Sequence, residues 1–203
     1  MVFKYITCAV VAYLIGNIET AIFLSRGKFK EDIRNYGSGN AGTTNMLRVF
    51  GIKPGIITFI GDFFKAVLAM LIAWFLGGED ATICGYIAAF FVVLGHDFPI
   101  FFSFKGGKGA ACTLAIAWFL MPIPSALAAT LCAALIIFLT KMVSIGSLSG
   151  ITVFAIVTIS LCYDNIPLVI LTLLLAALIY IRHVDNIKSL LHGSESRLME
   201  RKK

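Results

Sequence analysis

The chain has 203 residues, of which 59% are hydrophobic and 14% are charged, and its mean hydropathy is +0.93. These values lie far outside the range of soluble globular proteins and indicate an integral membrane protein. Lysine and arginine number 17 against 11 aspartate and glutamate, but they lie between long apolar runs, which argues against nucleic acid as a partner and favours anionic lipid or anionic substrates.

Seven apolar segments predict an all-α integral membrane protein with about seven transmembrane helices, in a single polytopic domain over residues 1–203. The first segment has no clear cleavage site and is expected to be a retained span. The fourth is shorter than the roughly 20 residues that cross a bilayer, so five spans with 109–140 as one re-entrant unit are the alternative. The segments are 5–24, 55–76, 81–102, 109–121, 124–140, 145–162 and 166–181.

The distribution of basic residues predicts the orientation of these spans. Lysine and arginine occur in 26–53, 103–108, 141–144 and the tail after 181, whereas 77–80, 122–124 and 163–165 contain none. Because basic loops are retained in the cytoplasm, the N-terminus is expected outside and the C-terminus inside. The polar motifs then all face the cytoplasm.

The first polar motif, residues 36–48, combines three glycines with small hydroxyl and amide side chains and ends at an arginine. Backbone N–H groups of such a loop can converge on an anion, and a guanidinium can add a bidentate phosphate contact. The alternative is a flexible loop that joins two spans. The candidate residues are Ser38, Gly39, Asn40, Thr44, Asn45 and Arg48.

The second motif, residues 95–109, is a glycine-rich turn that opens a helix, where free N–H donors and a positive helix end favour an anion. It is not a Walker A loop, because G-x-x-x-x-G-K-[ST] is absent. A basic membrane anchor with an aromatic cluster is the alternative, although it leaves the glycines unexplained. The candidate binding residues are His96, Lys105, Gly106, Gly107, Lys108 and Gly109.

The third motif follows the last span. His183 and Asn186 are three residues apart, so on a helix that continues from the span they share one face. A histidine can accept or orient a proton, Asn186 can fix a hydroxyl, and Glu195 can order a nearby arginine or lysine. The alternative is a solvated basic tail on lipid headgroups.

Ionisable residues also occur inside the spans, where they are costly unless paired. Asp62 and Lys65 are three residues apart on the second span and predict an ion pair that braces the site. Glu19, in the first span, is expected to reach the interface with its carboxylate and has no assigned role.

In sequence order, these motifs resemble those of the bacterial acyl-phosphate:glycerol-3-phosphate acyltransferase family. The resemblance covers the whole chain and rests on GSGNAGTTNMLR at 37–48, GDFFK at 61–65, GHDFPIFFSFKGGKG at 95–109, and HVDNI with GSES at 183–196. The chain departs from the family pattern at several positions, among them Glu19, where a proline is common, and Val184, where an arginine is common.

The resemblance implies transfer of a fatty acyl group from acyl phosphate to the 1-hydroxyl of glycerol 3-phosphate, with lysophosphatidic acid and phosphate as products. It implies a catalytic set of Ser38, His183, Asn186 and Glu195, with Ser38, Arg48 and the 105–109 turn holding phosphates. An acyl phosphate already carries a good leaving group, so this chemistry needs no covalent nucleophile. The expected location is the bacterial cytoplasmic (inner) membrane, with the active site facing the cytoplasm.

The expected partners are glycerol 3-phosphate, acyl phosphate and membrane lipid, with functional coupling to the enzyme that forms the acyl phosphate. No cofactor or metal is expected, since three histidines without dense carboxylate neighbours match no usual ligand spacing. Two other classes stay open: an organic-anion or phosphate transporter, whose polar groups would gather at mid-membrane, and a non-catalytic scaffold, which would tolerate substitution of the glycines.

Overall fold

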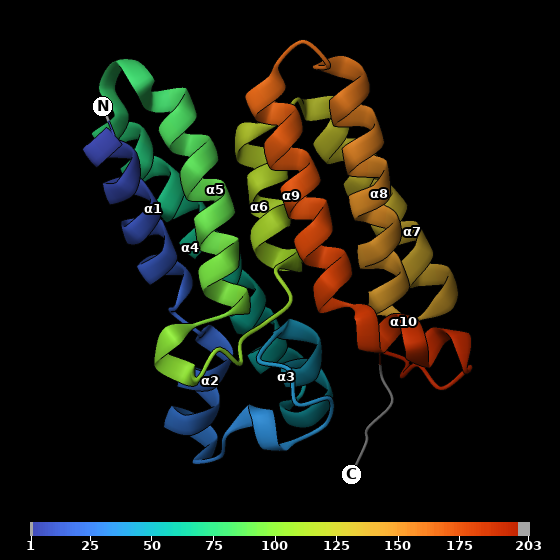
Figure 1. The fold of residues 1–203 in the computed structure, drawn as a ribbon. Coiled ribbons are helices and arrows are strands. Elements are labelled where there is room, and N and C mark those ends of the chain that lie inside the picture. The colour runs from blue at the N-terminus through green and yellow to red at the C-terminus, as the bar shows by residue number, and fades with distance from the viewer. Residues whose placement is uncertain (1, 199–203) are drawn as a thin grey trace. The chain divides into compact units, whose positions relative to one another are not determined.

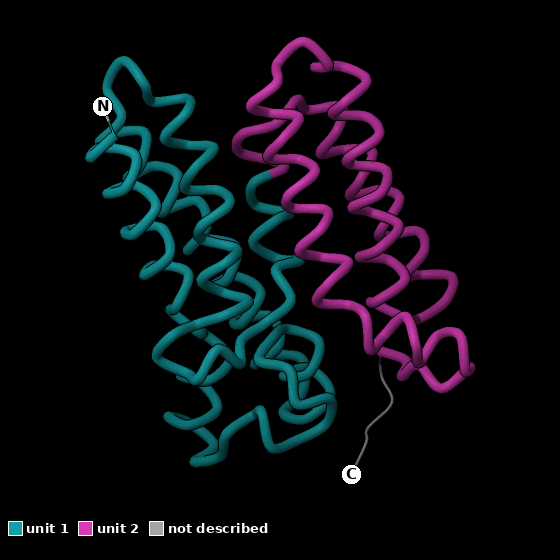
Figure 2. Tube along the Cα trace, in the orientation of Figure 1, with its two compact units in different colours: residues 1–116, 201–203 teal, residues 117–200 magenta. Residues whose placement is uncertain are grey.

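The computed structural model describes residues 2–198, and the described chain is helical and contains no strand. The chain divides into two compact units (Figure 2), and their described parts are residues 2–116 and 117–198. The expectation of a single domain stays a prediction, because a compact half need not fold independently. The helices are α1 (Val2–Gly16), α2 (Thr20–Leu24), α3 (Thr43–Phe50), α4 (Ile52–Gly77), α5 (Ala81–Asp97), α6 (Ala110–Leu120), α7 (Ile123–Thr140), α8 (Val143–Leu161), α9 (Ile166–Arg182) and α10 (Val184–Leu191), with short turns η1 (Ser25–Phe29), η2 (Ile33–Asn35), η3 (Gly78–Asp80) and η4 (Ile100–Phe102).

Helices α1, α4 and α5 form the bundle of unit 1 (Figure 1). Helices α4 and α5 are joined by η3 into a hairpin, and α1 packs against both. Glycines permit a close approach of α1 and α5, because a Cβ at Gly16 would overlap the Val92 carbonyl and one at Gly95 would overlap the Tyr13 carbonyl. The close crossing holds the ends of these two helices together.

The first apolar segment is interrupted, although the sequence predicted one continuous span over 5–24. Helix α1 ends at Gly16, Glu19 has the non-helical angles φ −87° and ψ 89°, and α2 begins at Thr20. A broken helix leaves carbonyl groups without their helical donors, which is unfavourable inside a membrane. The ammonium of Lys65 supplies those donors, since its Nζ lies 2.9 Å from the Gly16 oxygen and 2.8 Å from the Ile18 oxygen.

The segment between the first two long helices is more ordered than a flexible loop. Its short helices α2, η2 and α3 enclose a small apolar core, and Phe102 of η4 packs against that core. The first and second polar motifs are therefore tied to one another inside unit 1. The core consists of Ala21, Ile22, Ile33, Ala41 and Met46, and the partly buried side chains on it are Leu24, Val49, Phe50 and Phe102.

Helix α6 has 11 residues, so it is about 16 Å long, roughly half the thickness of a bilayer core. This agrees with the prediction of a short fourth segment. The boundary between the two units falls inside this helix, after Ile116. Pro122 and the Pro124 that follows in the first turn of α7 separate the two helices, because proline is suited to a helix start and not to its interior.

Unit 2 contains the α7–α8 hairpin and α9, which packs against α8. Lys141 turns the hairpin in a left-handed conformation at φ 60°. Asn165 caps α9, and its side chain accepts a hydrogen bond from the Leu168 N–H at 3.2 Å. The bond from the Leu198 N–H to the Lys141 oxygen, at 2.7 Å, ties the segment after α10 to the hairpin turn.

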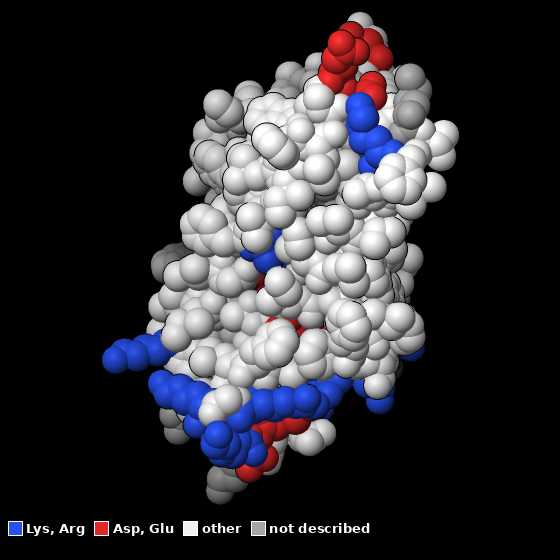
Figure 3. Space-filling view, turned by 90° about the vertical axis from the view of Figure 1, so that its left-hand side faces the viewer, with Lys and Arg blue, Asp and Glu red and all other residues white. Residues whose placement is uncertain are grey.

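By length and composition, four helical stretches of the described chain could cross a membrane, or five if the α9–α10 pair counts as one. One of the four, Ile52–Phe102, contains both α4 and α5. Figure 3 shows most basic side chains of this face at one end, with acidic ones among them, and an acidic group with a basic side chain next to it at the opposite end. This excess of basic side chains at one end is the charge asymmetry from which the sequence predicts orientation. The number of spans and their direction stay predictions.

Candidate functional site

A buried charge cluster lies where the broken first span meets α4 and α5. Its members are Glu19, Asp62, Lys65 and His96, each with 5% exposure or less. Lys65 Nζ lies 3.2 Å from Asp62 Oδ1 and 3.7 Å from Glu19 Oε1, so the ion pair expected from the spacing of Asp62 and Lys65 is present. His96 Nδ1 lies 2.8 Å from Lys65 Nζ and 3.1 Å from Glu19 Oε1. The expectation that Glu19 reaches the interface is wrong, because its carboxylate is enclosed by these partners.

His96 also determines the shape of the glycine-rich turn. The Gly107 N–H donates to the His96 carbonyl at 3.0 Å, so this donor is not available to an anion as the sequence suggested. A Cβ at Gly106 would overlap the His96 carbonyl, and one at Gly107 would overlap His96 Nε2. Two of the glycines are therefore needed for packing. His96 itself lies behind the turn, which argues against the direct substrate contact predicted for it.

The basic residues of the same turn are more accessible. Lys105 is exposed and Lys108 is half-buried, and Gly109 precedes the first residue of α6. Ammonium groups beside a helix N-terminus favour a bound anion. Gly109 itself is buried, and Asp97 Oδ1 would lie 3.2 Å from a Cβ at this position, so the phosphate contacts expected of these three residues stay a prediction.

Asn45 organises the first motif from inside. Its amide nitrogen lies 3.3, 2.9 and 3.0 Å from the carbonyl oxygens of Ile33, Tyr36 and Asn40, and its oxygen accepts from the Ser38 N–H at 3.0 Å. Asn45 is 1% exposed, and its amide is occupied by the backbone. Asn45 therefore holds the loop in shape, and the substrate contact predicted for it gains no support.

The remaining candidates of the first motif surround this amide. Ser38 and Gly39 are exposed, whereas Asn40, Thr44 and Arg48 are partly buried. Thr44 and Arg48 lie on α3, four residues apart and so on one face of the helix. The motif is thus a loop that leads into a helix, and its exposed residues are the ones that a substrate could reach.

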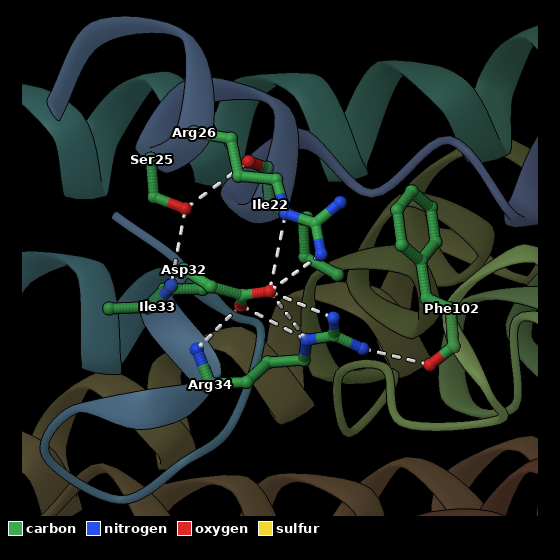
Figure 4. Close-up of polar contacts among 7 residues, drawn as sticks. All are labelled: Ile22, Ser25, Arg26, Asp32, Ile33, Arg34 and Phe102. Atoms are coloured by element: carbon green, nitrogen blue, oxygen red, sulfur yellow. Dashed lines mark hydrogen bonds and ion pairs between the residues drawn. The ribbon is translucent and has the colours of Figure 1, made fainter. Parts of the chain in front are cut away.

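Figure 4 shows a second charge cluster, at the surface of unit 1, which joins the two motifs. Asp32 accepts from Arg26 at 2.8 Å and from Arg34 at 2.8 Å, and Arg34 Nη1 donates to the Phe102 carbonyl at 2.8 Å. Both guanidinium groups also lie within 6 Å of the centre of the Phe102 ring, at 5.9 and 5.8 Å. The hydrogen bonds from Arg34 hold the pKa of Asp32 well below its usual range.

The third motif lies in unit 2. The helix does not continue straight through it, as the sequence suggested, because α9 ends at Arg182 and the axis turns by 56° before α10. His183 sits at this bend with φ −103° and ψ 9°, is 4% exposed, and its Nδ1 lies 2.8 Å from the Ile179 carbonyl. A carbonyl only accepts, so Nδ1 carries a proton. Asn186 lies beyond the bend, on α10.

Glu195 has different partners from those expected. Its Oε1 accepts from Asn186 Nδ2 at 2.8 Å and from Ser144 Oγ at 2.7 Å, so it orders an amide and a hydroxyl rather than the arginine or lysine predicted. Asn186 and Glu195 are thereby brought together within unit 2. The meeting of this motif with the two glycine motifs of unit 1 stays a prediction.

Sequence reasoning missed Glu19, Asp32 and Arg34. The signal for Glu19 was present, since two acids and one lysine inside the first two spans leave a buried charge without a partner. The Asp-x-Arg spacing is too common to have pointed to the surface cluster. In the part of the chain that the structure describes, no group of three or more His, Cys, Asp or Glu side chains could hold a metal ion.

Comparisons with known proteins agree with this fold. Residues 6–193 match the model of a family described as glycerol-3-phosphate acyltransferase. A glycerol-3-phosphate acyltransferase of Clostridioides difficile is 41% identical over 207 residues, with 99% of this chain and 98% of that protein covered. The crystal structure of the integral membrane glycerol 3-phosphate acyltransferase PlsY in its glycerol 3-phosphate form has a TM-score of 0.87 and 32% identity, over 95% of this chain and 94% of that one.

The same protein, in its lysophosphatidic acid form, has a TM-score of 0.83 and 31% identity over the same shares of the two chains. The family match spans most of the chain, and the relatives are covered almost end to end. The resemblance inferred from the three polar motifs is confirmed. This chain is a member of the glycerol-3-phosphate acyltransferase family, and it has the all-helical fold of an integral membrane protein.

Proposed function

We propose that the protein acylates the 1-hydroxyl of glycerol 3-phosphate to form lysophosphatidic acid, with acyl phosphate as the donor and inorganic phosphate as the second product. Solved relatives are named for their glycerol 3-phosphate and lysophosphatidic acid forms, which supports the acceptor and the product. The observation that carries the proposal is the proximity of the two glycine-containing motifs in unit 1, where Phe102 packs against the apolar core of the first motif and its carbonyl accepts a hydrogen bond from Arg34.

The reaction needs two phosphate sites, close approach of the reactants and a proton acceptor. Ser38, Arg48 and the turn with Lys105, Lys108 and Gly109 hold the phosphates in this proposal. Gly39, Asn40 and Thr44 line the same pocket. Positive charge here stabilises the leaving phosphate as the hydroxyl attacks the acyl carbon, so no covalent enzyme intermediate is required.

His183 and Asn186 orient the attacking hydroxyl. Because His183 Nδ1 already donates to a backbone carbonyl, Nε2 is the ring atom that would take the proton. A phosphate oxygen of the substrate is the other acceptor. Glu195 fixes the Asn186 amide, so that the amide is oriented before substrate binds.

Acyl phosphate is the donor that the family resemblance implies, and it suits a site without a covalent nucleophile, since a mixed anhydride reacts directly with an alcohol. The acyl chain enters from the surrounding lipid, so a soluble acyl carrier is not needed. We place the protein in the bacterial cytoplasmic membrane with this site facing the cytoplasm, where basic loops are retained. It would draw its donor from the enzyme that forms acyl phosphate.

Purified protein in lipid, given glycerol 3-phosphate with either acyl phosphate or acyl-CoA, tests the donor. We expect lysophosphatidic acid and free phosphate with acyl phosphate. Product with acyl-CoA but none with acyl phosphate would refute the donor assignment. The absence of product with both donors would refute the reaction.

Two variants with matched controls test the residue roles. Arg48→Ala should raise the KM for glycerol 3-phosphate, whereas exposed Lys28, changed to alanine, should leave it unchanged. His183→Ala should mainly lower kcat. His192 is the control, because its Nδ1 makes the same contact to a carbonyl four residues earlier, at 2.7 Å, on an exposed side chain. Normal kinetics in both test variants would remove these roles.

A further inference from the structure

Two hydrogen bonds tie the segment after α10 to the start of α8. Ser144 Oγ donates to Glu195 Oε1 at 2.7 Å, and the Leu198 N–H donates to the Lys141 carbonyl, also at 2.7 Å. Glu195 itself lies in irregular backbone, over residues 194–197. A carboxylate on a long side chain in such a segment has no fixed position of its own, so it depends on contacts like the one from Ser144.

The hydroxyl of Ser144 is used differently from most helical hydroxyls in this chain. A helical serine or threonine can bond to the carbonyl four residues earlier, as Thr58, Thr130 and Thr172 do here. Ser144 lies in the first turn of α8 and donates instead to a side chain outside its own helix. It is 5% exposed, so water competes little for this bond. The contact to Glu195 is therefore the main use of this hydroxyl as a donor.

Glu195 links Ser144 to Asn186. The same oxygen, Oε1, accepts from Asn186 Nδ2 at 2.8 Å. Because a carboxylate offers only acceptors, the amide atom beside it is the nitrogen, and the amide cannot turn over without losing this bond. The carboxylate also lies against the first turn of α8, where the positive end of the helix favours it. The place of Ser144 on α8 therefore sets the direction of the Asn186 amide.

We propose that Ser144 is a positioning residue that acts through Glu195 to hold the Asn186 amide in place for the attacking hydroxyl. Without the Ser144 hydroxyl, the Glu195 side chain turns more freely and the amide turns with it, so the reactive arrangement is populated less often. The phosphates are held elsewhere in the proposed site, so substrate binding changes less than turnover. This consequence for catalysis rests on the proposed function, whereas the link between the three side chains does not.

Ser144→Ala removes the hydroxyl and little else. We expect kcat to fall about tenfold, the effect of losing one hydrogen bond to a charged group, and the KM for glycerol 3-phosphate to stay within about twofold of wild type. Ser144→Thr keeps the hydroxyl and should restore most of the activity. The matched control is Ser149→Ala, since Ser149 is half-buried and lies on another face of α8, five residues further on. An unchanged kcat in Ser144→Ala would overturn the proposal.

A double-mutant cycle separates a positioning role from a general loosening of the fold. In Asn186→Ala the amide that Ser144 positions is gone, so adding Ser144→Ala should lower kcat by no more than about twofold further. A second loss of about tenfold in that background would show that Ser144 acts by another route, and the proposal would fail.

Nitrogen-15 NMR of asparagine-labelled protein in lipid tests the link without an assay of activity, with the Asn186 signal assigned by its loss in Asn186→Ala. We expect the side-chain amide protons of Asn186 to shift and to exchange faster with water in Ser144→Ala, but not in Ser149→Ala. Ser144→Cys keeps a weak donor and should give an intermediate result, which tests the link even if the alanine variant is unstable. An Asn186 signal that stays as in wild type in both Ser144 variants would refute the link. If the wild-type protein forms no lysophosphatidic acid from acyl phosphate, the proposed function fails, and the NMR result still decides whether Ser144 holds Asn186.

Discussion

Unit 1 contains two charge clusters, one buried between helices and one at the surface. The inner cluster of Glu19, Asp62, Lys65 and His96 is at most 5% exposed. The outer cluster places Arg26 and Arg34 around Asp32, with the Arg26 side chain 53% exposed. Both clusters contact the segment that carries the glycine-rich turn. In the inner cluster the His96 carbonyl accepts from the Gly107 N–H, and in the outer cluster Arg34 donates to the Phe102 carbonyl.

The difference shows how the medium governs what charges can do. Inside the span, an unpaired charge is costly, so each change affects the whole cluster. At the surface, water and salt screen the same interactions, so an excess of positive charge is tolerated and can serve to attract a substrate. Substitutions should therefore have large effects inside and small ones outside.

The largest expected effect is that of Lys65→Met. It leaves the buried carboxylates of Glu19 and Asp62 without their cation and the carbonyls of Gly16 and Ile18 without a donor, so we expect the free energy of unfolding to fall by about 3–5 kcal/mol. Denaturant titration in detergent micelles measures it. Lys4→Met, which breaks the half-exposed pair with Asp80 at 3.0 Å, is the control and should have an effect of less than about 1 kcal/mol. Equal losses would remove the distinction between the two settings.

The next largest is that of Gly107→Ala, which forces a methyl group against the His96 ring. Overpacking of this kind costs about 1–3 kcal/mol, and it should also raise the KM for glycerol 3-phosphate because the turn moves. Gly27→Ala is the control, since nothing lies within 4 Å of its added Cβ. Activity and stability close to wild type in Gly107→Ala would show that the turn does not depend on its packing against His96.

A smaller effect is expected for Arg34→Lys, which keeps the charge but cannot hold both Asp32 and the Phe102 carbonyl. We expect a loss of about 1 kcal/mol in unfolding free energy. A modest rise in the KM for glycerol 3-phosphate should accompany it, because the two motifs are held together less firmly. The exposed Arg26→Lys is the control and should change neither quantity measurably. An equal loss in both variants would mean that the Phe102 contact does not matter.

The smallest expected effect is a change with pH, below about pH 4, in the stability that Asp32 contributes. The pKa of Asp32 is depressed in the folded protein, chiefly by Arg34, so its contribution is present above the unfolded pKa of about 3.9 and is lost as pH falls from there through the lower folded value. The stability of wild type should therefore exceed that of Asp32→Asn by a constant amount at pH 5–7, and this advantage should begin to shrink below about pH 4. Unfolding measured across pH 3–7 checks it. An advantage that grows in acid would contradict the assignment.

The sequence by itself determined the class of fold and the family. Long apolar stretches must be helical in a bilayer because every backbone group has to find its partner within the segment, and the predicted bounds for α4, α7, α8 and α9 lie within three residues of the observed ones. The polar motifs were recognisable because ordinary short loops between spans rarely combine so many glycine and hydroxyl residues with basic ones. The pairing of Asp62 with Lys65 also followed, since three residues place both on one helix face.

Only the tertiary structure decided what surrounds these residues. The break before Thr20 is stable because Lys65, from another helix, donates to the carbonyls that the break exposes, and no local pattern around Glu19 encodes that contact. The same holds for Gly107, whose glycine is required by the His96 ring rather than by an anion. Periodicity reports which face of a helix is apolar, whereas a buried charge is stabilised by partners distant in sequence, and these are specified only when the chain has folded.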